Sequence, residues 1–172
     1  MEKALKDKIK AIKIVATDVD GVLTDGGAYY SSRGDTMKKF HIRDGMGANL
    51  LRRNNIPTVI ITKEKNQIIK QWAKKMNIYK VYDGIIHKEA ILEKLCLEFK
   101  TKFDNICYVG DDVNDLELMK KVGVSACPND AVSLVKEYAT IVMKQKSGEA
   151  AFRELVDLIL SIKFPTRENF YE

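Results

Sequence analysis

The sequence predicts an α/β fold in which helices cover both faces of one doubly wound, mainly parallel sheet. Short apolar runs suited to buried strands recur along the chain and alternate with segments of helical apolar spacing. This alternation is typical of parallel sheets with right-handed crossovers. With 172 residues, of which 45% are hydrophobic, the chain is expected to form a single domain over 1–172.

The first strand is an apolar run that ends where two acids and a glycine mark a turn. Including it, we expect strands at 12–17, 58–62, 80–82, 106–110, 124–127 and 140–143. Helical patterns lie between and after them, at about 45–54, 65–76, 88–99, 114–121, 130–137 and 148–162. The charged first ten residues predict an amphipathic turn or helix without the apolar core of a signal peptide. The tail, about 164–172, is expected to lie outside the core.

One segment, about 24–44, interrupts the alternation. Two short strand-like pieces flank a turn rich in serine, glycine and aspartate, which is typical of a β-hairpin. Because the hairpin directly follows the first strand, it should stand as a flap over the carboxyl edge of the sheet. It is too short to be a cap domain, so the crevice below it should be open unless another subunit closes it.

Composition excludes several classes of function. The net charge of +5 is mild, and no block of basic residues suggests nucleic-acid binding. No apolar stretch approaches the length of a membrane span. The three cysteines are widely spaced in apolar surroundings, which predicts buried thiols rather than disulfides or a zinc site. We therefore expect a cytoplasmic protein with no nucleic-acid or membrane partner.

Polar residues with catalytic potential follow four of the predicted strands. Asp18 and Asp20 follow the first, Thr62 ends the second, Lys88 lies beyond the third, and Asp111 follows the fourth. Because the carboxyl ends of parallel strands share one edge, these side chains should converge. Acids massed in this way need a cation, and Mg²⁺ with oxygen ligands is the simplest choice.

Such a set supports phosphoryl transfer. Asp18 can act as nucleophile and form an aspartyl-phosphate, while Asp20 protonates the leaving group and then activates water. Mg²⁺ would be held by Asp18, the main-chain carbonyl of Asp20 and Asp111. Thr62 and Lys88 would bind the phosphoryl oxygens.

These residues carry a specific resemblance. Asp18-Val19-Asp20-Gly21-Val22-Leu23-Thr24, Ile60-Ile61-Thr62, Lys88 and Gly110-Asp111-Asp112-Val113-Asn114-Asp115 resemble the four motifs of the haloacid dehalogenase superfamily. Phe40-His41-Ile42-Arg43-Asp44-Gly45 and Ser147-Gly148-Glu149-Ala150-Ala151-Phe152-Arg153-Glu154 are similar to motifs of its capless subfamily, the 3-deoxy-D-manno-octulosonate 8-phosphate (KDO 8-phosphate) phosphatases. The resemblance covers about 10–162.

The resemblance implies an Mg²⁺-dependent phosphatase acting on a keto-sugar acid phosphate, which releases the free sugar acid for lipopolysaccharide or other surface-glycan synthesis. It also implies homotetramers in which the hairpins form a central barrel and a neighbour roofs each active site. Asp115 would lie behind Lys88 or a metal-bound water. Asp112 could either bind the metal or cap the following helix. Arg43 could bind the substrate carboxylate or form a salt bridge at the hairpin base.

The chain departs from the subfamily after the second motif. Relatives usually carry Gly-Arg-Lys there, whereas this chain has Lys63-Glu64-Lys65. Glu64, a candidate specificity residue, resembles enzymes acting on nine-carbon 2-keto-3-deoxynononate (KDN) or N-acetylneuraminate 9-phosphates. It also resembles phosphatase-like oligomerisation domains of sialate cytidylyltransferases, which are the alternative function. A phosphatase for nucleotides or small sugars is weaker, because such substrates usually need a cap to exclude water.

Overall fold

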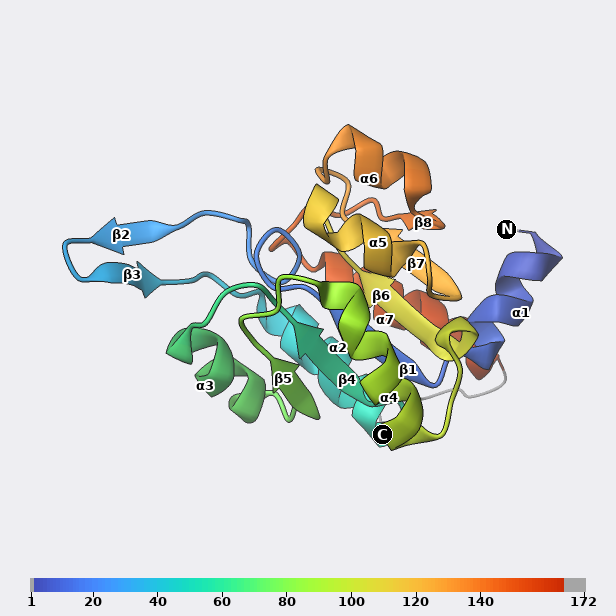
Figure 1. The fold of residues 1–172 in the computed structure, drawn as a ribbon. Helices are drawn as coiled ribbons and strands as arrows, with labels where there is room; N and C mark the ends of the chain where they lie inside the picture. The colour runs from blue at the N-terminus through green and yellow to red at the C-terminus, as the bar shows by residue number, and fades with distance from the viewer. Residues whose placement is uncertain (1, 166–172) are drawn as a thin grey trace.

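A six-stranded parallel sheet forms the centre of the computed structural model, which describes residues 2–165 (Figure 1). In spatial order its strands are β5 (Lys80–Tyr82), β4 (Thr58–Ile61), β1 (Ile14–Thr17), β6 (Ile106–Val109), β7 (Val124–Cys127) and β8 (Ile141–Val142). From β1 the chain proceeds to β4 on one side and later to β6 on the other. The strand β1 therefore borders the topological switch point, where sheets of this class bind ligands.

Side chains of the central strands point alternately to two hydrophobic layers. In β1, Val15 belongs to one layer, whereas Ile14 and Ala16 belong to the other. The first layer packs beneath α1 (Lys3–Ala11), α2 (Ile42–Arg53), α3 (Gln67–Lys75) and α7 (Ala151–Lys163). The second packs beneath α4 (Ile91–Phe99), α5 (Leu116–Met119) and α6 (Ser133–Tyr138). Helices on both faces thus bury the four central strands β4, β1, β6 and β7, which explains why these strands are nearly continuously apolar.

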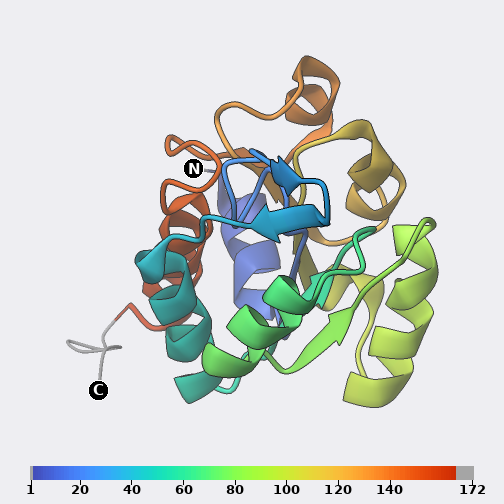
Figure 2. The ribbon, with the colours of Figure 1, turned by 90° about the vertical axis from the view of Figure 1, so that its left-hand side faces the viewer.

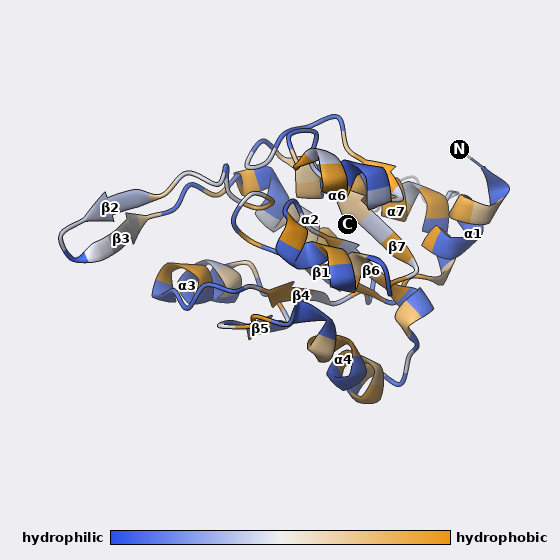
Figure 3. Ribbon diagram, turned by 45° about the horizontal axis from the view of Figure 1, so that its top comes forward, coloured by the Kyte–Doolittle hydropathy of each residue, from blue (hydrophilic) through white to orange (hydrophobic). Residues whose placement is uncertain are grey.

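Amphipathic helices complete the two layers. Figure 3 shows hydrophobic and hydrophilic residues mixed along the helices. In α3, for example, Ile69 and Ala73 are buried four residues apart, while Lys70 and Lys74 are exposed. This spacing places the apolar stripe on the sheet and the lysines in solvent.

The structure differs from the sequence prediction at several element boundaries. Helix α2 begins at Ile42 rather than near residue 45, because the His41 ring accepts the backbone N–H of Arg43 as an N-cap. Two helices are preceded by 3₁₀ turns, Lys88–Ala90 before α4 and Val113–Asp115 before α5. The expected tail begins too early, since Phe164 packs against the core. The remainder of that expectation, 166–172, lies outside the described residues.

The expected hairpin is present and projects from the body of the molecule (Figure 1). It consists of β2 (Tyr29–Ser31) and β3 (Gly34–Met37), which pair antiparallel. Viewed from its own side, it stands in front of the sheet (Figure 2). No helix in the described part of the chain is long and apolar enough to cross a membrane.

Candidate active site

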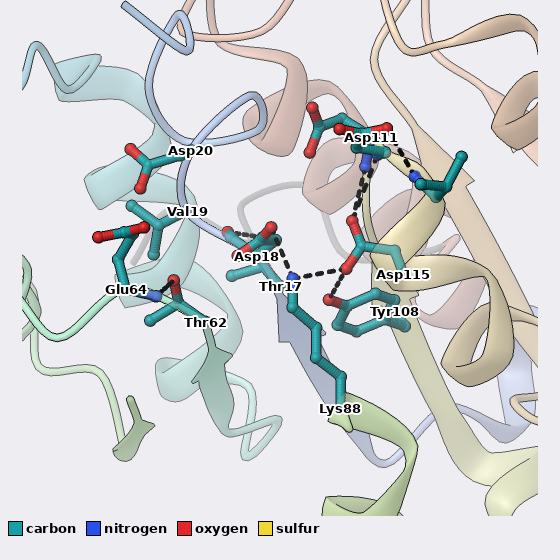
Figure 4. Close-up of polar contacts among 12 residues, drawn as sticks. Thr17, Asp18, Val19, Asp20, Thr62, Glu64, Lys88, Tyr108, Asp111 and Asp115 are labelled. Carbon is teal, nitrogen blue, oxygen red and sulfur yellow. Dashed lines mark hydrogen bonds and ion pairs between the residues drawn. The ribbon is translucent and has the colours of Figure 1, made fainter. Parts of the chain in front are cut away.

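Asp18 stands at the carboxyl end of β1, where the chain leaves the sheet (Figure 4). Its backbone N–H donates to the carbonyl of Val109 at 2.9 Å, so β6 still holds the backbone at this residue. The side chain is only 6% exposed, and its Oδ1 accepts no hydrogen bond from the described residues. This carboxylate oxygen is therefore held largely out of water without a hydrogen-bond partner among the described residues.

Lys88 joins Asp18 to a second buried acid. Its Nζ lies 2.7 Å from Asp18 Oδ2 and 2.7 Å from Asp115 Oδ1. Lys88 and Asp115 are both fully buried. Although burial lowers the pKa of Lys88, the adjacent carboxylates of Asp18 and Asp115 raise it overall, so the lysine is charged.

Asp115 is fully occupied by the protein itself. Besides Lys88, its Oδ1 accepts the hydroxyl of Tyr108. Its Oδ2 accepts the backbone N–H groups of Asp111 at 3.0 Å and Asp112 at 3.4 Å. Asp112 in turn accepts the N–H of Val113 at 2.7 Å and caps the 3₁₀ turn. Asp115 thus fixes both Lys88 and the loop that carries Asp111.

Asp111 lies near Asp18, and its carboxylate comes very close to the backbone of Gly21 in the loop after β1. A Cβ on Gly21, which has φ +83°, would lie 2.0 Å from Asp111 Oδ2. Only glycine fits between the loop after β1 and this carboxylate. No hydrogen bond from a described residue reaches the Asp111 carboxylate group, so its oxygens remain available to a ligand.

Asp20 is held by the foot of the hairpin. Lys38 Nζ lies 2.7 Å from Asp20 Oδ1, and the hydroxyl of Thr24 donates to the same oxygen at 3.2 Å. The Lys38 side chain is only 5% exposed, whereas that of Asp20 is 29% exposed. Asp20 Oδ2 has no partner among the described residues. The contacts of Oδ1 therefore orient the carboxylate, and Oδ2 remains available to exchange a proton with a bound substrate.

Thr62 ends β4 beside these acids. Its hydroxyl oxygen accepts the N–H of Glu64 at 3.2 Å, which folds the following residues into a tight turn. Glu64 is exposed, and in Figure 4 its side chain lies on the same side of Asp18 as Asp20. The carboxylate of Glu64 therefore lies at the exposed edge of the site.

Two contacts tie α7 and the segment before it to segments that follow β1. The N–H of Gly148 donates to the carbonyl of Val22 at 3.1 Å, and a Cβ there would lie 2.5 Å from the nitrogen of Asp25. The Asp44 carboxylate accepts the N–H of Arg153 at 2.8 Å and ties α2 to the first turn of α7. The segment around residue 148 thus buttresses the loop that carries Asp20.

A cavity of about 360 Å³ opens between these loops. Its lining residues are Asp18, Asp20, Thr62, Lys63, Glu64, Asp111, Asp112, Val113 and Asn114. Arg43 lines a different cavity, together with Glu149, Arg153 and Asp157. Because α2 starts at Ile42, Arg43 belongs to that helix and faces the side of α7. The structure brings the other sequence-predicted residues together and leaves Arg43 apart.

Burial and mutual repulsion hold protons on the acids of this site. Burial, reinforced by Asp115, raises the pKa of Asp18 from 3.8 to about 7. Burial and the charges of Asp18, Asp115 and Asp112 raise the pKa of Asp111 to about 8. Lys88 opposes both shifts without cancelling them. The site is therefore richer in negative charge than its own lysine can balance.

The residues present fit a magnesium ion. Carboxylate oxygens of Asp18, Asp111 and Asp115 lie within 4.8 Å of one another. Asp115 is committed to Lys88, Tyr108 and two backbone amides, whereas Asp18 Oδ1 and the Asp111 carboxylate are open. Hard oxygen ligands of this kind are those that Mg²⁺ prefers. Asp18 and Asp111, with the Asp20 carbonyl predicted from the sequence, are the candidate ligands.

Metal-free protein should lose stability as the pH rises from about 4 to about 8. Over this range the folded carboxyls, with pKa values of about 7 and 8, retain protons that the unfolded chain has released, so deprotonation favours unfolding. Mg²⁺ binds the deprotonated acids, so the rise in melting temperature caused by the ion should be larger at pH 8 than at pH 6. Calorimetry with EDTA and with Mg²⁺ measures both trends. Equal Mg²⁺-induced shifts at the two pH values would contradict this assignment.

Sequence reasoning missed two residues of the site. Lys38 lies within the predicted hairpin, 24–44, and no pattern in that segment indicates that it reaches Asp20. Tyr108 was treated as an apolar strand residue. A tyrosine in a strand buried on both faces needs a hydroxyl partner, which it finds in Asp115.

Comparison with known proteins agrees with this geometry. Residues 53–155 match the family model described as haloacid dehalogenase-like hydrolase. KDO 8-phosphate phosphatase from Haemophilus influenzae is 32% identical over 171 residues, covering 96% of this chain and 95% of the relative. The enzyme of the same name from Escherichia coli K12 is 34% identical over 153 residues, covering 89% and 81%.

A solved structure extends the likeness to a ligand-bound relative. KDO 8-phosphate phosphatase from Moraxella catarrhalis, in complex with magnesium ion, phosphate ion and KDO, superposes with a TM-score of 0.90. It is 28% identical, and the match covers 95% of this chain and 94% of that one.

Proposed function

The chain belongs to the haloacid dehalogenase-like hydrolases, and we propose that within this family it releases inorganic phosphate from KDO 8-phosphate. It is a phosphatase that depends on Mg²⁺. The observation that carries the proposal is the convergence of Asp18, Lys88 and Asp111 at the carboxyl end of β1, beside a cavity that Asp18, Asp111 and Thr62 line. A decayed, non-catalytic oligomerisation domain would have no need to retain these acids.

Asp18 is the nucleophile in this proposal. Its carboxylate oxygen attacks phosphorus, so an aspartyl-phosphate (an acyl phosphate) forms on Asp18 while the bond between phosphorus and the sugar oxygen breaks. Lys88 lies 2.7 Å from Asp18 Oδ2 and thereby fixes the orientation of the attacking carboxylate. Bound Mg²⁺ would neutralise the repulsion between this carboxylate and the anionic phosphoryl group. The Thr62 hydroxyl and neighbouring amides bind the phosphoryl oxygens.

Asp20 moves the proton in both halves of the reaction. Its Oδ2 first gives a proton to the departing sugar alkoxide. It then takes a proton from the water that attacks phosphorus, which breaks the Asp18–phosphate bond and releases inorganic phosphate. Lys38 and Thr24 hold Oδ1 throughout, so the carboxylate keeps its orientation between the two steps.

The substrate is tested by comparing kcat/KM for KDO 8-phosphate with that for KDN 9-phosphate. We expect the eight-carbon ester to be preferred, because the curated relatives described above carry that activity in their names. Preference for the nine-carbon ester would instead assign the dominant role to Glu64. Turnover of neither ester, by folded protein with Mg²⁺, would overturn the proposed substrate class.

We also propose that the hairpins of four chains assemble, so that a neighbour covers each cavity. Large apolar side chains are exposed along the hairpin and the start of α2: Tyr29, Tyr30, Met37, Ile42 and Met46. A patch of this kind marks an interaction surface. No described residue of β2 or β3 is among those that line the cavity, and a second copy seated over it would exclude water from the reacting centre.

Charges placed on the hairpin should dissociate the assembly. Tyr30 is 75% exposed and Met37 is 59% exposed, so Tyr30→Glu with Met37→Lys can leave the chain folded. We expect the mass by light scattering to fall to that of one chain, with a raised KM. Leu97→Glu, on α4 and 81% exposed, is the matched control and should retain the assembly. An assembly that survives the double substitution would refute the hairpin contact.

A further inference from the structure

We propose that Lys63 is a specificity-determining residue that binds the carboxylate of the sugar acid. The inference rests on the proposed function, since it concerns the end of the same substrate remote from phosphorus. Lys63 follows Thr62 directly and lines the cavity that contains Asp18. It is exposed and, within residues 2–165, forms no ion pair or hydrogen bond through its side chain.

The charges around the cavity single out this lysine. Its lining includes five carboxylates, those of Asp18, Asp20, Glu64, Asp111 and Asp112, and a single cation, Lys63. Two further lysines lie close by but are committed. Lys88 is fully buried between Asp18 and Asp115, and Lys38 is paired with Asp20. Lys63 is therefore the ammonium group at this wall that can meet a second anionic group of the substrate.

Hydrogen bonds on either side of Lys63 fix its backbone, whereas its side chain is free to extend toward a ligand in the cavity. Thr62 donates its N–H to Tyr82 at 2.9 Å, accepts the N–H of Ile85 at 3.0 Å, and binds Glu64 through its hydroxyl. Lys63 has no positive φ, so the turn forms without a glycine. A flexible stem on an anchored Cα is suited to reaching a charged group across an open cavity.

The geometry also separates the two ends of the substrate. The phosphoryl group must sit against Asp18 and Thr62, at the buried end of the cavity. Lys63 and Glu64 stand at the exposed end, where Glu64 can accept hydrogen bonds from sugar hydroxyls. A carboxylate placed at Lys63 and hydroxyls placed at Glu64 match an acidic sugar better than a neutral sugar phosphate.

Product inhibition distinguishes binding of the sugar-acid carboxylate by Lys63 from binding of the phosphoryl group. Each of the two products carries only one of these anionic groups. Free KDO carries the carboxylate without phosphate, and inorganic phosphate carries the reverse. In Lys63→Met we expect the ratio of Ki for KDO to Ki for phosphate to rise about tenfold, the value of one charge-assisted hydrogen bond. KM for KDO 8-phosphate should rise in parallel. Lys63→Arg should keep the ratio within about threefold.

The matched control is Lys74→Met, which removes an exposed lysine of α3 outside the cavity and should leave the ratio unchanged. An unchanged ratio in Lys63→Met would overturn the assignment. Equal rises of both Ki values would also overturn it, because they would place Lys63 on the phosphate or in the fold. Failure of the wild-type enzyme to hydrolyse KDO 8-phosphate would overturn the proposed function and with it this role.

Discussion

Replacing Asp18 with Asn should lower kcat by about 10⁴-fold or more without unfolding the protein. An amide cannot form the acyl phosphate, whereas it can occupy the same volume and keep a contact with Lys88. Because burial raises the pKa of Asp18 to about 7, the charged carboxylate is unfavourable in metal-free protein at pH 8. The metal-free variant should therefore unfold at a temperature no lower than that of the wild type.

Steady-state turnover of KDO 8-phosphate and calorimetry on the same preparation measure the two halves of this prediction. Asp7→Asn is the control, because Asp7 is exposed on α1 and the chemical change is identical. A variant that retains more than about a tenth of the wild-type kcat would exclude Asp18 as the nucleophile, whatever its stability.

Replacing Lys88 with Met should reduce both activity and stability. The substitution leaves the carboxylates of Asp18 and Asp115 buried without their shared cation, a change that costs about 3–5 kcal/mol. For a chain of this size the melting temperature should fall on the order of 10 °C. The direction of the Asp18 carboxylate is also lost, so kcat should fall by about 10²-fold or more.

A double-mutant cycle separates the charge effect from lost packing. In Asp18→Asn/Lys88→Met one of the two stranded carboxylates is neutral, so the double variant should be more stable than the sum of the single effects predicts. Lys94→Met, an exposed position on α4, controls for the loss of a surface lysine. Strict additivity would show that Lys88 does not hold these acids together.

The order of strands and helices was predictable because periodicity of apolar residues survives in a single sequence. The site edge followed from it: once 12–17, 58–62 and 106–110 were strands of one parallel sheet, Asp18, Thr62 and Asp111 had to converge. Arg43 was harder, because its direction depends on whether residue 42 ends a strand or begins a helix. His41 decides this through a local cap that apolar spacing does not reveal.

Contacts between segments that are distant in the sequence could not be predicted either. Lys38 reaches Asp20 only because the hairpin returns over the loop after β1. No pattern within either segment encodes the direction in which the hairpin leaves the sheet. The roles assigned to Asp20, Thr62 and Glu64 stay predictions until the variants are measured. The sequence left Asp112 open between binding the metal and capping a helix, and in the structure its carboxylate caps the 3₁₀ turn, whereas Asp115 binds Lys88.

The contact of Gly148 with Thr24 and Asp25 has a consequence for the order in which the enzyme becomes competent during synthesis. The loop that presents Asp20 leaves the ribosome well before Gly148, the residue that packs against it. Contacts of such long sequence separation form only after the intervening chain is ordered. A nascent chain that stops before Gly148 can contain every proposed catalytic residue and still lack the support that aligns them.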